Sequence, residues 1–260
     1  MVEEQTIKQE FSDSINRNFD GLLEFSFFSG RFAFDSAKKY KSDIDCIVVL
    51  NNSAYQQNLS GGLEGFVKDY IKIHKTYNYL PDMHFPGDVL TRAQLNESLQ
   101  GRGYEVIGDS LHLSPVISEQ DFDKPDMDYR IWRNEMCFNN GRFICGDYEK
   151  FRQGRILAAK SIISFLISEG QICQNPSEII KKILEKGRPY FGLDSRNGDI
   201  NNIDQQQIFS EALIKFDLSQ INCLENLRLV NKIKSQGWHA KYLYDWEDLR
   251  KIAWEELRKF

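Results

Sequence analysis

Two carboxylates stand one residue apart in the stretch Ser42-Asp43-Ile44-Asp45-Cys46, directly before a run of aliphatic residues. Alternate side chains of an extended chain point to the same side, so Asp43 and Asp45 are expected to converge at the start of a strand. Two like charges this close repel each other unless a cation lies between them. The spacing therefore predicts a divalent-metal site, and the structural alternative is a solvated, polar beginning of a strand.

The elements around these aspartates follow an α/β pattern. Apolar residues at four-residue intervals predict a helix over 5–19, and an apolar run that stops at Ser29-Gly30 predicts a strand over 22–28. Residues 43–50 are typical of a second strand, and a helix is expected over 61–77. The remaining elements expected in this half are a strand over 81–85, a helix over 91–100 and a hairpin over 104–115.

The second half of the chain has helical periodicity. We expect a mixed α/β (α+β) domain over 1–118 and a helical C-terminal domain over 119–260, with a site in the cleft between them. A helix capped by Asp147 is predicted to run to Ser168. The other helices expected in this half lie over 177–186, 204–216, 219–236 and 245–259.

Composition excludes several classes of protein. The chain has 260 residues, of which 41% are hydrophobic and 27% charged, and no apolar run approaches the roughly 20 residues of a membrane span. The five cysteines are scattered singly, so neither a zinc site nor a disulfide framework is indicated. The polar N-terminus MVEEQTIKQEF is unlike a leader, and a cytoplasmic location is expected. A net charge of −5 disfavours broad nucleic-acid binding.

The turn Phe28-Ser29-Gly30-Arg31 and the later Asp43-Ile44-Asp45-Cys46 resemble the DNA polymerase beta-like nucleotidyltransferase superfamily. That family combines a hydrophobic residue, glycine and a small residue with a downstream [DE]h[DE]h motif. Ser29 stands here where the family has the first glycine of its turn. The resemblance covers roughly residues 5–90 in motif order and implies a nucleotidyltransferase-fold mixed sheet flanked by helices.

The resemblance implies an enzyme that transfers a nucleoside monophosphate from a nucleoside triphosphate, ATP among them, to an acceptor hydroxyl. Asp43 and Asp45 would bind Mg²⁺, which prefers carboxylates supplemented by water and phosphate oxygens. A third carboxylate would complete the metal site or activate the acceptor. Asp82 is the first choice because it is expected to open the third strand, and Asp88 is the alternative.

The resemblance also implies a set of nucleotide contacts. The turn would present backbone N–H groups, a hydroxyl and a guanidinium to the phosphates, and Gly30→Val is expected to block their approach with little change in thermal stability. A helical lysine would meet the triphosphate, although its amine can instead reach the surface. The residues implied are Ser29, Gly30, Arg31, Ser42 and Lys160.

The acceptor stays open among three classes: a small molecule such as an aminoglycoside or lincosamide, a protein hydroxyl, or an RNA end, as in toxin–antitoxin nucleotidyltransferases. A different function is a catalytically silent member that uses the fold as a nucleotide sensor or interaction module. Ser29 in the turn and the choice between Asp82 and Asp88 keep that alternative open.

Overall fold

A computed structural model describes residues 2–33, 39–83, 87–92, 95, 103–107, 110–114, 141–168, 207–208, 210–212 and 246–260. For residues 2, 55–56, 103–107, 110–114, 161–168 and 246–247 it describes the backbone alone. The chain forms two compact units. The first comprises Met1–Gln94, Asn139–Phe151 and Tyr242–Phe260, and the second comprises Leu95–Phe138 and Arg152–Lys241.

A four-stranded mixed sheet forms the centre of the first unit, in the order β3-β2-β1-β6. β1 is antiparallel to both of its neighbours, and β2 is parallel to β3. Phe28 at the end of β1 pairs with Cys46 at the start of β2, and Ile47 pairs with Asp88. The strands span Leu23–Phe28 (β1), Cys46–Leu50 (β2), Asp88–Thr91 (β3) and Arg142–Gly146 (β6).

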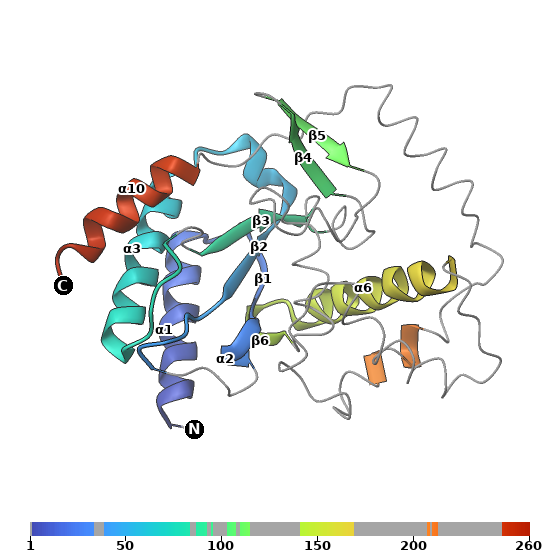
Figure 1. Cartoon of the computed structure of the whole chain (residues 1–260), viewed down its shortest axis with the longest axis horizontal. Coiled ribbons are helices and arrows are strands. Elements are labelled where there is room, and N and C mark those ends of the chain that lie inside the picture. The colour runs from blue at the N-terminus through green and yellow to red at the C-terminus, as the bar shows by residue number, and fades with distance from the viewer. Residues whose placement is uncertain are drawn as a thin grey trace. The chain divides into compact units, whose positions relative to one another are not determined.

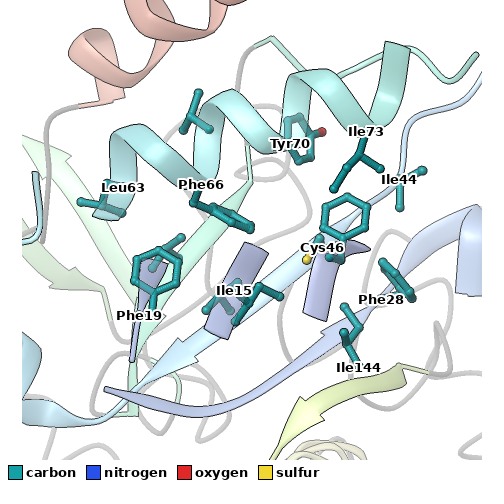
Figure 2. Close-up of a cluster of buried hydrophobic side chains, with 14 of the residues drawn as sticks. Ile15, Phe19, Phe28, Ile44, Cys46, Leu63, Phe66, Tyr70, Ile73 and Ile144 are labelled. Carbon is teal, nitrogen blue, oxygen red and sulfur yellow. The ribbon is translucent and has the colours of Figure 1, made fainter. Parts of the chain in front are cut away.

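Three helices lie on one side of this sheet: α1 (Val2–Asn18), α3 (Ser60–Tyr77) and α10 (Trp246–Leu257), as Figure 1 shows. The apolar stripe of α1 is buried against the sheet, and α10 packs on α3. Alternate residues of β2 enter this core. They are Cys46, Val48 and Leu50, and some of their neighbours are drawn in Figure 2.

The opposite face of the sheet holds a separate group of aromatic rings. Phe25 and Phe27 of β1 pack against Phe151, the first edge-on and the second tilted, with ring centroids 5.7 and 5.4 Å from that of Phe151. Phe151 lies in the first turn of α6 (Tyr148–Ser168), where its N–H donates to the carbonyl oxygen of Asp147. The side chain of Asp147 accepts the N–H of Lys150 at 3.1 Å, which confirms the predicted N-cap.

The remaining described elements are short. The first unit contains α2 (Gly30–Ala33) and a 3₁₀ turn, η1 (Asn52–Gln56). The second contains an antiparallel hairpin of β4 (Gly103–Ile107) and β5 (Ser110–Ser114), as predicted.

The mixed α/β class is confirmed, but part of the strand assignment was wrong. Residues 43–45 and 81–83 are not in a strand: β2 begins at Cys46 and the third strand at Asp88. Thr91 ends β3, and Arg92 and Leu95, the described residues that follow it in the predicted helix over 91–100, are helical. β6 was not predicted, although it is bounded by Gly141 and Gly146. The expected helices at 177–186 and 219–236 lie outside the described residues, as does most of 204–216.

The predicted domain boundary at residue 118 also falls outside the described residues and stays a prediction. Two segments from the second half of the chain, β6 and α10, nevertheless pack on the first unit. In the part of the chain that the structure describes, no helix is both long and apolar enough to cross a membrane.

Candidate active site

The β1–β2 pair brings the small-residue turn against the second aspartate. Because Phe28 and Cys46 are register partners, the residues that follow β1 lie beside those that precede β2. The N–H of Ser29 donates to the carbonyl oxygen of Asp45 at 3.0 Å. The turn and Asp45 are therefore held together by a backbone hydrogen bond at the end of the β1–β2 pair.

Gly30 occupies a position that requires glycine. Its φ of 59° lies in the left-handed region, and a side-chain carbon there would collide with the Oδ2 atom of Asp45. The carboxylate of Asp45 thus lies directly on the backbone of the turn. The expectation that Gly30→Val changes thermal stability little is wrong, because a β-branched residue is strained at this φ.

Gly30→Ala tests this contact, with Gly21→Ala as its matched control. Gly21 also has a positive φ, 71°, but nothing lies within 4 Å of its missing side chain. Both variants are expected to lose about 1–2 kcal/mol of stability from the left-handed backbone. Only Gly30→Ala also displaces the Asp45 carboxylate, so only it should weaken Mn²⁺ binding in a calorimetric titration. Equal Mn²⁺ affinity in the two variants would contradict the placement of Asp45.

Asp43 lies in an acidic and partly buried environment. Burial raises the pKa of its carboxyl and the charge of Asp82 raises it further, while a hydrogen bond from its own backbone and the charge of Arg31 lower it. The third-carboxylate candidate Asp82 is therefore within electrostatic reach of Asp43, although it lies before β3 and not on it. A cation bound between these oxygens would relieve the repulsion.

A backbone contact explains why Asp82 comes close to Asp43. After α3 ends at the left-handed residue Asn78, the chain turns back along the segment that precedes β2. The N–H of Leu80 donates to the carbonyl oxygen of Ser42 at 2.9 Å. Asp43 and Asp82 each lie within two residues of this bond, one on each segment.

Asp88, the alternative third carboxylate, opens β3 and pairs in register with Ile47. Val89 belongs to the helix-covered core, so Asp88 lies on the other face. Ile44 and Cys46 belong to the same core, so Asp45 between them points to that other face as well, while Asp43 lies two residues earlier, outside the strand. Asp82 is thus within electrostatic reach of Asp43, and Asp88, like Asp45, lies within electrostatic reach of Cys46.

The residues predicted to contact the nucleotide differ in how buried they are, and they are divided between the two units. Ser29 and Ser42 are 1% and 4% exposed, and their backbones serve the hydrogen bonds described above. Arg31 is exposed in α2. Lys160 lies half-buried on α6 in the second unit. Contact of any of these residues with a nucleotide stays a prediction.

Two α3 side chains that sequence analysis did not assign to the site hold its backbone. His74 Nε2 accepts the N–H of Ile44, the residue between the paired aspartates, at 2.9 Å. The hydroxyl of Tyr70 accepts the N–H of Asp82 at 3.0 Å. The sequence did contain a signal for this role: a histidine lies one helical turn after Tyr70, beside an apolar stripe. A polar ring that is buried there needs hydrogen-bond partners.

His74 makes a pH-dependent contribution to stability. Burial lowers its pKa to about 4, so the ring is neutral in the folded protein at pH 7. Because this is below the ordinary value of 6.5, stability is lost as the pH falls from about 6.5 through 4. The loss should reach about 2–3 kcal/mol at pH 4.5.

Denaturant unfolding at pH 7 and pH 4.5 measures this loss when the protein is compared with His74→Gln. The variant cannot be protonated at this position and should lack the loss, while the contribution of Asp43 is common to both proteins. The same pH dependence in both proteins would contradict a buried, neutral His74.

The carboxylates fit magnesium in ligand type and charge. Mg²⁺ is usually bound by one or two carboxylates, with waters and phosphate oxygens completing its shell. Asp43 and Asp45 can supply the two carboxylates, and Asp82 or Asp88 a third. Among the described residues, no three His, Cys, Asp or Glu side chains stand together as a ready-made metal site.

An open hollow of about 510 Å³ lies elsewhere on the first unit. It is lined by residues of α10 and by the residue that follows its end, and α10 packs on α3, on the helix-covered face of the sheet. The lining residues are Arg250, Lys251, Trp254, Glu255 and Arg258. This hollow is not part of the candidate site.

Comparison with known proteins assigns no family to the chain: no protein-family model matches it, and no curated protein is detectably similar to it.

Proposed function

We propose that the protein is a magnesium-dependent nucleotidyltransferase that transfers a nucleoside monophosphate from a nucleoside triphosphate to an acceptor hydroxyl. The observation that carries the proposal is the contact between the Gly30 turn and the Asp45 carboxylate, with Asp43 two residues before Asp45 and Asp82 within electrostatic reach of Asp43. A phosphate-binding turn beside paired carboxylates is the arrangement that this chemistry needs.

Each group has a role in the proposed reaction. Asp43 and Asp45 hold the metal, which when bound neutralises phosphate charge and orients the triphosphate. The acceptor oxygen forms a bond to the α-phosphorus while the bond from that phosphorus to pyrophosphate breaks. Asp82, or Asp88 in the alternative, orients the acceptor hydroxyl and takes its proton. Arg31 offers positive charge to the phosphates.

Several finer expectations belong to the same proposal. They are the nucleotidyltransferase fold itself, a helical C-terminal domain that closes over the site, a triphosphate contact from Lys160, and a cytoplasmic location. The antiparallel β1–β2 pair followed by a parallel β2–β3 pair supports the first of them.

The second candidate function is a catalytically silent nucleotide-binding module. It is favoured by Ser29, which stands where the family has glycine and whose side chain is buried instead of open to a phosphate. Such a protein would bind a metal triphosphate without transferring it.

A labelling survey separates the two functions. The protein is incubated with Mg²⁺ and each α-³²P-labelled ribonucleoside triphosphate, with an aminoglycoside, a lincosamide, total RNA or cell protein as acceptor. Label that moves to one acceptor class, with release of pyrophosphate and dependence on Asp45, supports the enzyme. Binding of a triphosphate with no transfer to any class supports the silent module.

A further inference from the structure

Helix α3 supports both carboxylate segments of the candidate site through two side chains one turn apart. Tyr70 and His74 lie at positions i and i+4 of the same buried stripe and are 2% and 0% exposed. Their rings are 4.1 Å apart between centroids, and Phe11 of α1 packs edge-on against both. Figure 2 shows Tyr70 and Ile44 within the same buried cluster.

Each of these two residues forms a hydrogen bond to a different segment of the site. His74 has both ring nitrogens engaged: Nδ1–H donates to the carbonyl oxygen of Tyr70 at 2.8 Å, and Nε2 accepts from Ile44. In this tautomer His74 holds the peptide N–H of Ile44, the residue between Asp43 and Asp45. Tyr70 fixes the peptide N–H of Asp82, on the other segment.

We propose that Tyr70 and His74 are positioning residues that set the affinity of the site for its divalent metal. His74 would act on the paired aspartates through Ile44, and Tyr70 would act on Asp82. This inference rests on the proposed function, because it assumes that Asp43 and Asp45 are metal ligands and, for the route through Tyr70, that Asp82 is a third. It adds that the geometry of those ligands is set by a helix on the other face of the sheet.

The physical reason is that neither aspartate segment is itself regular structure. Residues 42–45 precede β2, and residues 79–83 lie between α3 and β3. A hydrogen bond from the backbone N–H of each segment to a side chain of the packed helix limits how far each carboxylate can move when the metal is absent. Partners that orient metal ligands commonly contribute about 10–100-fold to metal affinity.

The first test is the Mn²⁺ affinity of the full chain, measured from the electron paramagnetic resonance signal of the free ion. His74→Leu keeps the buried volume but removes the acceptor, and should weaken Mn²⁺ binding by about 10–100-fold. His74→Gln places an amide oxygen near the position of Nε2 and should restore most of the affinity. Faster amide hydrogen exchange at Ile44 in His74→Leu than in His74→Gln would identify the bond responsible.

The second test is a double-mutant cycle between Tyr70→Phe and Asp82→Asn. Tyr70→Phe removes one oxygen and should weaken Mn²⁺ binding about two- to tenfold. In the Asp82→Asn background that effect should vanish, because the segment that Tyr70 orients no longer carries a ligand. Tyr77→Phe is the matched control: its hydroxyl donates to Glu10 at 2.6 Å, away from the site, and its loss should leave Mn²⁺ affinity unchanged.

The possible results distinguish a failure of this inference from a failure of the proposed function. If the unaltered protein binds Mn²⁺ through Asp45 but Tyr70→Phe and His74→Leu bind it equally well, the positioning role is overturned and the metal site stands. An effect of Tyr70→Phe that persists in the Asp82→Asn background overturns the specific route through Asp82. If the unaltered protein binds no Mn²⁺, or binds it independently of Asp45, the proposed function fails and this inference fails with it.

Discussion

Asp43→Asn and Asp45→Asn are each expected to abolish magnesium-dependent nucleotidyl transfer and to weaken binding of the metal triphosphate more than about 100-fold. Changes to residues that only orient metal ligands cost about 10–100-fold, so loss of a ligand should exceed that range. Isothermal titration with Mg²⁺ and the donor triphosphate measures the binding loss, and pyrophosphate release measures the rate.

The fold should survive the Asp43→Asn change, which makes the comparison clean. Because burial and Asp82 raise the pKa of Asp43, its ionisation costs stability as the pH rises above the ordinary value of 3.8. Asp43→Asn removes that cost, so the metal-free variant should melt no lower than the unaltered protein at pH 7. Full nucleotide binding and turnover in both aspartate variants would show that the site lies elsewhere.

Asp82→Asn is expected to lower the rate of nucleotidyl transfer while triphosphate binding stays nearly unchanged. Phosphate oxygens complete the metal shell when a triphosphate is bound, so Asp43 and Asp45 should hold the metal triphosphate without Asp82, although Asp82 contributes to the binding of free Mn²⁺. Transfer also needs a group that takes the acceptor proton. General-base assistance is typically worth about 10²–10⁴-fold, so turnover should fall by that factor with triphosphate affinity retained within a few-fold. Steady-state kinetics with the acceptor found in the labelling survey gives both quantities.

Asp88→Asn is the comparison for this prediction. It changes a carboxylate on the same face of the sheet, and the register partner of Asp88, Ile47, lies two residues after Asp45. A large rate loss in Asp88→Asn with none in Asp82→Asn would transfer the role to Asp88. Full turnover in both variants would contradict a carboxylate base in this reaction.

The local parts of the site could be predicted from sequence, because they depend on residues close together along the chain. The stop of β1 at Ser29 and the alternation of Asp45 with the core residues Ile44 and Cys46 follow from strand periodicity, although β2 begins at Cys46 and not at Asp43. The contact of Gly30 with Asp45 could also be expected once the two strands were assumed to pair.

The parts that depend on distant segments could not be predicted. The third strand was placed at 81–85, where the apolar residues are too few to distinguish a short strand from a loop, and it begins at Asp88. The proximity of Asp82 to Asp43 depends on the turn at Asn78 and on one backbone bond to Ser42. The supports from Tyr70 and His74 required knowledge of which side of α3 faces the sheet.

The central claim is that the Gly30 turn and the paired aspartates bind a metal triphosphate. Its most direct test is isothermal titration of each of the four ribonucleoside triphosphates into the protein, with Mg²⁺ and then with EDTA, beside Asp45→Asn. We predict saturable binding of at least one triphosphate that requires Mg²⁺ and is lost in Asp45→Asn. No binding of any triphosphate, or binding unchanged by EDTA and by Asp45→Asn, would contradict it.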